Sequence, residues 1–578
     1  MKIKSFIVPC LILTATASMT VSCEDMLTQD SDNVIYADNE HLIDATDTIY
    51  SVTGIINKLQ NIADRTVLLG ELRGDLVDVT SATSSDLRDV ALFNVGDSNI
   101  YNSPKDYYSV INNCNYFLAK ADTALKNNRN EKIFKKEYAA VKAYRAWTYL
   151  QLVINYGKVP FVTEPILSKA DAEKTYPKKD IKGICDYFIQ DIAPYADVDL
   201  PTYGSIRGAD SHLFFMPVYV VLGDLNLWAG NYKDAAWSYY KYIDFRTLNT
   251  GMNGGYWDQN EFSYRSPNDT YSDLFYDETY NSNSDIVSII PMDSCEAEGN
   301  YSKLRELYNA QEANNYTVSI VPSTALFNLS ESQKYCNYST KGVVSYAPTD
   351  LEKHKSGDLR LYSSYYTSSM KIDKKTTLLQ HIYKFSSRNV FIYRKTGIYL
   401  RMAEALNRAG FPRFAYEILS TGLNNASIQK DVLPYYPSDS LWIKSFNFPN
   451  TEYVTNTAEN NQNTQGVHSR GSGYSQYNEY YKFPTDTTIL DSLSQQAYQV
   501  EKVEDMIMDE NALETSFEGY RFYDLMRVAL RRNDPSYLSK RVYNRKGSEN
   551  YNTMFGTIKS NLNDVSTWYL KWKGQIGY

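Results

Sequence analysis

Two distant segments of the chain share one spacing of aromatic, aliphatic, small and turn residues. In each segment an aromatic residue is followed by a large apolar residue, a small residue, a turn glycine, an alanine and a second large residue. Every position of the second segment lies 180 residues after its counterpart in the first. The positions are Tyr219, Leu222, Gly223, Gly230, Ala235 and Tyr239 in the first, and Tyr399, Met402, Ala403, Gly410, Ala415 and Leu419 in the second.

This spacing is that of a tetratricopeptide helix pair, in which small residues let the two helices approach closely. Two unrelated amphipathic helix pairs would be the alternative. Because a single pair cannot bury its apolar face, the pattern predicts a mostly α fold with a helical repeat body. Helical periodicity also predicts helices over residues 49–59, 104–118, 137–155 and 504–532, the last with Gly519 in mid-run.

Two long tracts interrupt the helical pattern. Residues 246–390 and 427–500 are rich in Asn, Ser, Gly and Tyr and show no sustained helical period. Insertions of this length are usually functional, so they are expected to form a ligand-binding region. The predicted divisions are a signal peptide (1–22), a lipidated tether (23–45), a repeat region (46–245), an aromatic insertion (246–390), a repeat helix pair (391–426), a loop-rich segment (427–500) and a helical C-terminal region (501–578).

The N-terminus has the pattern of an export signal. Lys2 and Lys4 precede an apolar run, and Cys23 follows a small residue at the expected cleavage point. This placement predicts a lipoprotein signal, in which Cys23 is lipidated and anchors the protein to a membrane. An ordinary signal peptide with a cysteine nearby by chance is the alternative.

Composition excludes some functions. The 578 residues carry a net charge of −9, which argues against nucleic-acid binding. No run reaches the roughly 18 to 20 apolar residues of a membrane helix. The 52 tyrosines exceed what a core needs, because each buried hydroxyl requires a partner. Many tyrosines are therefore expected on surfaces and clefts.

The sequence predicts no catalytic residue, metal site or cofactor. The five histidines lack HExxH or any metal spacing, and there is no GxSxG or Walker motif. Cys114, Cys185, Cys295 and Cys336 have no zinc-type spacing and are interpreted as free thiols, with two disulfides as the alternative. We interpret His468 as a structural hydrogen-bonding residue.

Acid pairs and two tryptophans receive structural interpretations. A glycoside hydrolase would need two carboxyls across a cleft. Acids such as Asp505, Asp509 and Glu510 are interpreted instead as solvated helix faces or helix-terminal charges. Trp147 and Trp228, on helical faces, are expected in the core.

Ligand capture without turnover requires aromatic rings that converge with polar groups. The aromatic insertion offers such rings. Its candidate ligand-binding residues are Tyr256, Trp257, Tyr264, Tyr271 and Tyr276.

Several motifs together resemble the SusD/RagB family of nutrient-binding outer-membrane lipoproteins of Bacteroidetes. The similarity runs in order along nearly the whole mature chain. The motifs are Cys23–Leu27, Tyr108–Leu118, Tyr144–Leu150 with Tyr156–Pro160, Tyr393–Asn407, Gly466–Gly473 and Phe517–Arg527.

This resemblance implies a helical body with four tetratricopeptide-type pairs and loop-built ligand sites, on the outer membrane at the cell surface. It implies a partner, a SusC-like TonB-dependent transporter, to which the lipoprotein delivers its ligand. It also implies that the segment from Glu71 to Asn94 helps to form the ligand surface, with Arg73 and Asp75 as candidate ligand-binding residues.

The sequence therefore predicts a non-catalytic glycan-binding lipoprotein that captures oligosaccharides. A RagB-like capture of peptides and a lipid-anchored glycan hydrolase are the alternative functions.

Overall fold

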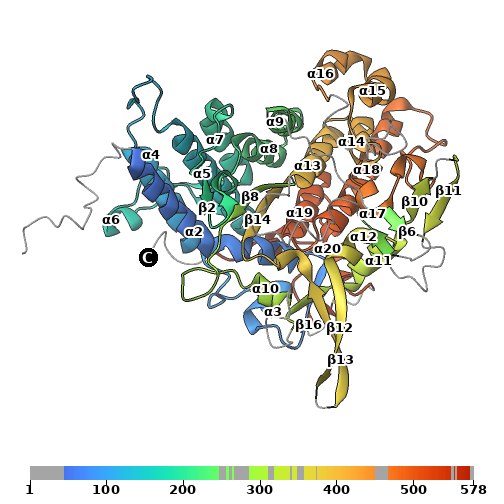
Figure 1. Ribbon diagram of the computed structural model, residues 1–578, viewed down its shortest axis with the longest axis horizontal. Coiled ribbons are helices and arrows are strands. Elements are labelled where there is room, and N and C mark those ends of the chain that lie inside the picture. The colour runs from blue at the N-terminus through green and yellow to red at the C-terminus, as the bar shows by residue number, and fades with distance from the viewer. Residues whose placement is uncertain are drawn as a thin grey trace, which may run out of the picture.

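Helices make up most of the described chain (Figure 1). The computed structural model describes residues 45–245, 256–258, 263–265, 285–309, 318–338, 341–347, 357–372, 374–448, 466–547, 552–553 and 556–572. The signal peptide and the predicted lipidation site Cys23 lie outside the described residues, as do Tyr271 and Tyr276.

The long helices pack in succession, each against the next (Figure 1). α4 packs on α5, α5 on α7, α7 on α8, α8 on α9, α9 on α13, α13 on α14, and α14 on α18. Their bounds are α2 (Ala45–Glu71), α4 (Pro104–Lys120), α5 (Lys135–Tyr156), α7 (Ile181–Ile192), α8 (Val218–Ala229), α9 (Tyr232–Phe245), α13 (Lys395–Arg408), α14 (Pro412–Leu419), α18 (Ser492–Glu514), α19 (Arg521–Arg532) and α20 (Ser536–Tyr543). The predicted mostly α, repeat-type architecture is confirmed.

The two segments with matching spacing are helix pairs, α8–α9 and α13–α14. Gly230 and Gly410 stand in the two interhelical turns with φ of +87° and +94°, a conformation that glycine adopts without steric cost. At Gly223 the ring of Tyr239 lies so close that an added Cβ would be 2.4 Å from its Cε1 atom. The small residue of the pattern therefore admits the partner helix, as predicted.

The long insertion does not separate the two pairs in space. α9 of the first pair packs directly against α13 of the second, although residues 246–390 lie between them in the sequence. The helical stack is therefore continuous from α9 to α13.

Many of the described tyrosines are buried, although the composition predicts many of them on surfaces and in clefts. Tyr108, Tyr144 and Tyr149 of α4 and α5 are at most 3% exposed. Their hydroxyls donate to the backbone carbonyls of Pro160, Phe214 and Val162. Each of these three hydroxyls thus has an acceptor on another segment, and the rings fill the space between helices while their hydroxyls connect loops to the helices.

The predicted helix over residues 504–532 is two helices, α18 and α19. They are separated at residues 515–520, where Gly519 has φ of +93°. This loop presses against α2, since a Cβ on Gly70 would lie 1.7 Å from the Gly519 carbonyl oxygen. The side chain of Glu71, the last residue of α2, accepts a hydrogen bond from the Gly519 amide at 2.8 Å. The chain breaks here because α2 occupies the space that a continuous helix would need.

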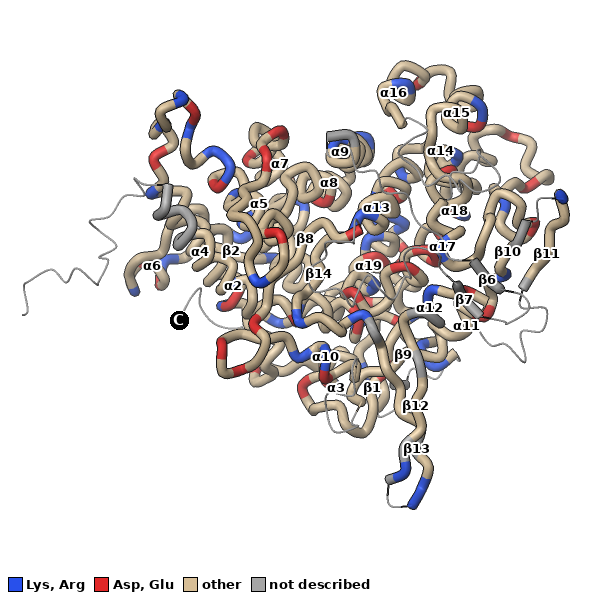
Figure 2. The backbone as a smooth tube through the Cα atoms, viewed as in Figure 1, with Lys and Arg blue, Asp and Glu red and all other residues tan. Residues whose placement is uncertain are grey.

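A buried network of charged residues surrounds the C-terminal end of α18. In Figure 2, segments coloured for acidic and for basic residues lie close together in this region. Arg394 donates to Asp285 at 2.5 Å and to both carboxylate oxygens of Glu518 at 2.8 Å. Arg360 donates to Asp358, at 2.8 and 3.0 Å, and to Glu510, at 2.9 Å. Both arginines also approach the carboxylate of Glu514, at 3.3 and 3.4 Å.

His468 belongs to this network. It is buried, its Nδ1 lies 2.6 Å from Glu510 Oε1, and its ring stacks on Tyr481 with 3.6 Å between centroids. Its structural interpretation is confirmed. Glu510 corrects another expectation, because it is an interior ion-pair partner and not part of a solvated helix face.

Short antiparallel strand pairs and short helices accompany the long helices of the stack. In the described chain the strand pairs are β1–β9, β2–β3, β4–β5, β6–β7, β8–β14, β10–β11, β12–β13 and β15–β16. The bounds of the strands are β1 (Val77–Val79), β2 (Lys158–Pro160), β3 (Lys178–Asp180), β4 (Ser205–Ile206), β5 (Ala209–Asp210), β6 (Tyr256–Asp258), β7 (Ser263–Arg265), β8 (Ile286–Ile290), β9 (Ile320–Pro322), β10 (Tyr335–Tyr338), β11 (Val344–Ala347), β12 (Tyr365–Ile372), β13 (Lys375–Ile382), β14 (Val390–Arg394), β15 (Asn552–Thr553) and β16 (Gly556–Thr557). The short helices are α3 (Ser85–Ala91), α6 (Lys169–Ala172), α10 (Leu304–Leu307), α11 (Thr324–Ser332), α12 (Leu359–Ser364), α15 (Asn425–Ser427), α16 (Ser440–Lys444) and α17 (Ser469–Ser472). The β12–β13 hairpin projects from the body (Figure 1).

Two further sequence expectations can be compared with the structure. Of the described residues, the stretch Ser211–Ala229 is long and apolar enough to cross a membrane, but 78% of it is buried, which is typical of a core helix. Cys114, Cys185, Cys295 and Cys336 are free thiols, as interpreted, and Cys295 is the exposed one of these four.

Replacing Gly223 by alanine should destabilise the repeat body. The added methyl group overlaps the buried Tyr239 ring, and overpacking of this kind costs about 1–3 kcal/mol. Gly397→Ala is the matched control, because Gly397 is also helical and has no atom within 4 Å of an added Cβ. The control should be stabilising by roughly 0.5–1 kcal/mol, as alanine favours a helix. Thermal unfolding followed by circular dichroism measures both, and equal melting temperatures for the two variants would contradict the packing argument.

Candidate functional site

Arg73, a candidate ligand-binding residue, lies in the interior and not on a ligand surface. It is 1% exposed. Its guanidinium donates to the carbonyls of Leu69 and Trp568, at 2.8 and 2.9 Å, and to the side chains of Asn155 and Tyr523. The group thus joins the end of α2 to α5, α19 and the C-terminal segment, and four of its five N–H donors are used within the protein.

Asp75 is buried as well, and it forms a bidentate ion pair with Arg521 of α19 at 2.6 and 3.0 Å. Burial alone would raise the pKa of this carboxyl, but the charge of Arg521 outweighs burial and holds the pKa below its usual value. The prediction that Arg73 and Asp75 contact a ligand is therefore wrong. Both residues connect helices in the interior of the protein. The prediction failed because the sequence alone does not show which side of a loop faces inward.

The aromatic candidates lie at the limit of the described chain. Tyr256 and Trp257 stand in β6, and Tyr264 stands in β7, which pair in antiparallel register with Trp257 opposite Tyr264. Their side chains lie outside the description, as do Tyr271 and Tyr276 entirely. The proposed ligand contact of these five residues stays a prediction.

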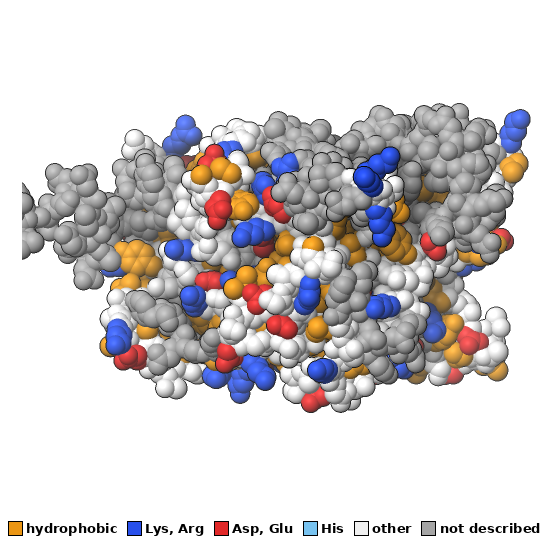
Figure 3. All heavy atoms as spheres, turned by 90° about the horizontal axis from the view of Figure 1, so that it is seen from below, with side chains coloured by type: hydrophobic (Ala, Val, Ile, Leu, Met, Phe, Trp, Pro, Cys, Tyr) orange, Lys and Arg blue, Asp and Glu red, His pale blue; other side chains and the backbone are white. Residues whose placement is uncertain are grey.

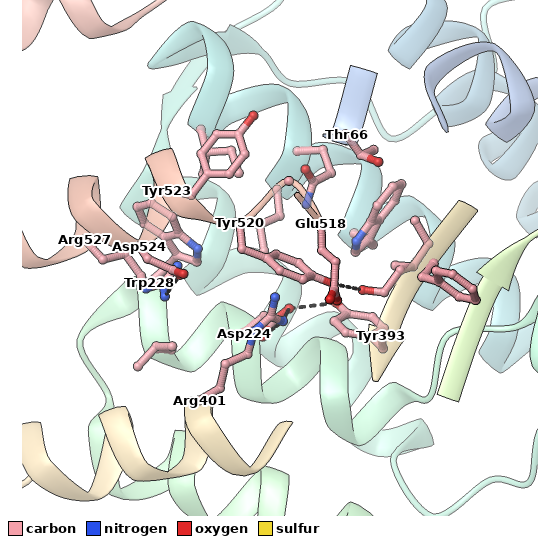
Figure 4. Close-up of a pocket in the computed structure, with 18 residues that line it drawn as sticks. Thr66, Asp224, Trp228, Tyr393, Arg401, Glu518, Tyr520, Tyr523, Asp524 and Arg527 are labelled. Carbon is pink, nitrogen blue, oxygen red and sulfur yellow. Dashed lines mark hydrogen bonds and ion pairs between the residues drawn. The ribbon is translucent and has the colours of Figure 1, made fainter. Parts of the chain in front are cut away.

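A small pocket lies where α8, α13, β14 and α19 meet (Figure 4). At its wall Asp224 accepts hydrogen bonds from the hydroxyls of Tyr239 and Tyr393, at 2.6 and 2.7 Å, and from Arg401 at 2.7 Å. Arg527 donates to both carboxylate oxygens of Glu404, at 3.0 and 2.8 Å. The charged groups of the pocket wall are therefore paired within the protein, in part with residues beyond the wall.

The free volume of this small pocket is about 50 Å³, room for a few water molecules, whereas ligand sites usually measure roughly 300–1,000 Å³. Trp147 and Trp228 both line it. Trp147 is buried as expected, but Trp228 is half-buried and stands under the guanidinium of Arg527, with 5.3 Å from the carbon to the ring centroid. The small pocket is thus a structural junction.

A larger cavity of about 440 Å³ opens beside the N-terminal half of α2, and its size is that of a ligand site. Five separate segments of the chain line it. They contribute Thr53, Ile56, Asn57 and Gln60 of α2, Tyr203, Ile206, Arg207, Ala209, Phe214 and Phe215 around the β4–β5 hairpin, Pro291 to Ser294, Arg305 of α10, and Arg388 with Asn389. We call this space the arginine cavity.

Its wall combines apolar surface with polar groups held at fixed positions. Phe214 and Phe215 are buried at its base, and Ile206 is exposed at its edge. Gln60 donates to the Pro291 carbonyl at 2.8 Å, and Asn389 accepts from the Met292 amide at 2.9 Å. These bonds tie the 291–294 segment to α2 and to the chain before β14.

Three arginines face one carboxylate among the described residues that line the arginine cavity. Arg207 donates to Asp293 at 2.9 Å, and Arg388 forms a bidentate pair with Glu306 at 2.6 and 2.7 Å. The lining therefore lacks, within the described chain, the two facing carboxyls that a glycoside hydrolase requires. Sequence reasoning named none of these lining residues, although the insertion 246–390, predicted to form a ligand-binding region, supplies Pro291 to Ser294, Arg305, Arg388 and Asn389. No motif marks residues that come together only in the fold.

No protein-family model and no curated protein matches the chain, whereas solved structures do. A SusD superfamily protein of Bacteroides vulgatus superimposes with a TM-score of 0.54 at 15% identity, over 90% of this chain and 96% of that chain. A SusD-like carbohydrate-binding protein of Bacteroides fragilis gives 0.52 at 14% identity, over 84% and 87%. A SusD-like carbohydrate-binding protein of Bacteroides vulgatus gives 0.51 at 14% identity, over 83% of each chain.

At these identities the likeness establishes the fold. The SusD-like architecture predicted from the motifs is confirmed, since the superpositions span 83–90% of this chain and 83–96% of the solved structures. What the chain binds is a separate question, because one fold can serve several functions.

Glu71 should make the stability of the folded protein depend on pH. Burial raises the pKa of its carboxyl to about 7 from an ordinary 4.5, so the native state holds a proton that the unfolded chain releases. By linkage, stability should fall as the pH rises from about 4.5 to about 7. Glu71→Gln should abolish this loss and stabilise the protein at pH 8 by roughly 2–4 kcal/mol.

Thermal unfolding of wild type and variant across pH 4 to 9 tests this expectation. Glu501→Gln on the exposed face of α18 is the control and should leave the pH profile unchanged. A Glu71→Gln profile parallel to the wild-type profile would show that the residue is ionised in the folded protein.

Proposed function

We propose that the protein is a non-catalytic glycan-binding lipoprotein of the cell surface, which captures oligosaccharides and delivers them to a SusC-like TonB-dependent transporter in the outer membrane. The observation that carries the binding function is the arginine cavity, a space of about 440 Å³ on a SusD-like fold. Carbohydrate binding by solved proteins of the same fold supports the choice of ligand.

The chemistry of the cavity wall suits a sugar. A pyranose ring offers apolar C–H faces, for which Phe214 and Ile206 provide matching surface, and hydroxyls that need fixed donors and acceptors. Asn57 is exposed on α2, and its side chain makes no hydrogen bond to any described residue. This amide is available to a ligand at the edge of the cavity.

The anchor and the partner are proposed on sequence grounds. Cys23 follows an export signal at a lipoprotein-type cleavage point. A lipid at Cys23 would hold the protein on the membrane that also contains the transporter, so captured ligand would need to travel only a short way. The motifs that resemble the SusD/RagB family support the SusC-like partner.

The proposal of binding without turnover is supported by the ion pairs that the carboxylates near the two cavities form. Asp224, Glu404 and Glu518, in or beside the small pocket, are each paired with an arginine, and so are Asp293 and Glu306 at the arginine cavity. An arginine partner stabilises the ionised form of a carboxylate, whereas a general acid must carry a proton.

Isothermal titration against a panel of neutral and acidic oligosaccharides and of peptides should detect binding of an oligosaccharide, with no new product on chromatography of the ligand. Asn57→Trp should block the arginine cavity and weaken binding at least tenfold, about 1.4 kcal/mol. Lys58→Trp is the control, because Lys58 is exposed on the same helix and does not line the cavity. Peptide binding alone would favour the RagB-like alternative, and cleavage of a bound glycan would favour a hydrolase.

Cys23→Ala tests the anchor. Without the lipidated side chain the protein should leave the membrane fraction of cells and appear in the soluble fraction, whereas wild type should stay with membranes and label with a radioactive fatty acid. Cys295→Ala, which removes an exposed thiol elsewhere, should behave as wild type. A variant at Cys23 that remains membrane-bound and labelled would contradict lipid anchoring at this residue.

A further inference from the structure

The arginine cavity has an excess of positive charge that the chain as a whole does not have. Its described lining contains Arg207, Arg305 and Arg388 against one carboxylate, Asp293, in a protein of net charge −9. On the face of the molecule shown in Figure 3, by contrast, described Lys and Arg side chains are intermixed with Asp and Glu. The excess is therefore a property of the cavity.

Two of the three guanidiniums already have a carboxylate partner. Arg207 pairs with Asp293, and Arg388 pairs with Glu306 and also donates to the Ser302 carbonyl at 2.8 Å. Arg305 makes no hydrogen bond and no ion pair with any described residue, and its Nε atom is buried without a partner. A buried donor without a partner destabilises the protein, so Arg305 favours a ligand that supplies the acceptor.

The position of Arg207 is a second, independent sign that the cavity is shaped for a ligand. Arg207 and Gly208 form the two-residue turn of the β4–β5 hairpin, with φ of +53° and +87°. Such turns favour Asn, Asp or Gly at the first position, because a larger side chain is strained at positive φ. Local strain of this kind is often retained where a side chain serves a binding site.

We propose that the arginine cavity selects acidic saccharides, with the anionic group of one sugar unit held by Arg305. A carboxylate or a sulfate presents oxygens that match the planar fork of a guanidinium in a bidentate hydrogen bond. The uncharged part of the same sugar would contact Phe214 and Ile206, and its hydroxyls would reach Asn57. This inference rests on the proposed function and names its substrate class.

An acidic saccharide fits the cavity better than an acidic peptide. The described lining pairs its positive charge with rigid apolar surface and side-chain amides. The strand residues of the described lining are Ile206 and Ala209 of the β4–β5 hairpin, whose strands are two residues long and too short to pair with an extended peptide. Peptide binding is therefore treated as an outcome that would overturn the inference.

The test uses the purified protein and three matched probes in isothermal titration: an oligogalacturonide, its fully methyl-esterified form, and a sulfated oligosaccharide of the same length. A poly-glutamate peptide is the fourth probe. At least one anionic saccharide should bind about tenfold or more tightly than the ester, because a charge-assisted bidentate bond is lost in the ester. Its affinity should also decrease with added salt.

Arg305→Gln should reduce the affinity for the anionic saccharide to that for the ester, while Arg305→Lys, which keeps the charge and loses the fork, should fall between them. Arg129→Gln removes the same charge from an exposed loop far along the chain and should have no effect. Asn57→Ala removes an amide from the exposed face of α2 and changes no charge. If the saccharide binds in the arginine cavity, this variant should weaken the binding of both the acid and the ester. Circular dichroism of each variant confirms that it folds.

The outcomes separate this inference from the proposed function. Equal binding of the ester and the acid, or an unchanged affinity in a folded Arg305→Gln variant, would overturn the acidic-saccharide inference while glycan binding stood. Tighter binding of poly-glutamate than of any saccharide would overturn it in favour of peptides. If neutral and acidic saccharides all failed to bind, the proposed function itself would be wrong.

Discussion

The ion pairs around the C-terminal end of α18 hold together parts of the chain that the long insertions separate. Arg394 and Arg360 connect Asp285, Asp358, Glu510, Glu514 and Glu518, which come from before β8, before α12, α18 and the loop after it. Charges buried this deeply are tolerated only when they are paired, and loss of one partner typically costs 3–5 kcal/mol. The network therefore fixes where the insertion re-enters the helical stack.

Two of the motifs that resemble the SusD/RagB family have a structural role in this network. Gly466–Gly473 supplies His468, which contacts Glu510 in the interior, and Phe517–Arg527 supplies Glu518 and Arg521 to interior ion pairs. Such groups cannot be changed singly without leaving a buried charge unpaired. The arginine cavity lies apart from the network, between α2 and the β4–β5 hairpin, and its walls carry side chains that vary in exposure and partner. A rigid interior thus supports a site whose chemistry can differ without loss of the fold.

Several features could be predicted from residues a few positions apart. Helix pairs with glycine turns follow from the spacing around Gly223 and Gly410, and α4 begins at Pro104, as expected for proline in a first turn. The roles of Arg73 and Asp75 could not be predicted. Their partners lie more than 400 residues away in the sequence, at Trp568 and Arg521, so local pattern does not distinguish an interior guanidinium from one that faces a ligand.

The sequence by itself determined the class of fold, since helical period, small residues at helix contacts and turn glycines act over one or two turns of chain. Only the tertiary structure decided which charges are paired inside and which line a cavity. Residues as distant as Asn57, Arg207, Arg305 and Asn389 share one wall of the arginine cavity because the helical stack brings their segments together. Arg305 is available to a ligand because no described residue pairs with its guanidinium. The sequence does not show this, since the packing of the whole chain decides which residues are neighbours in space.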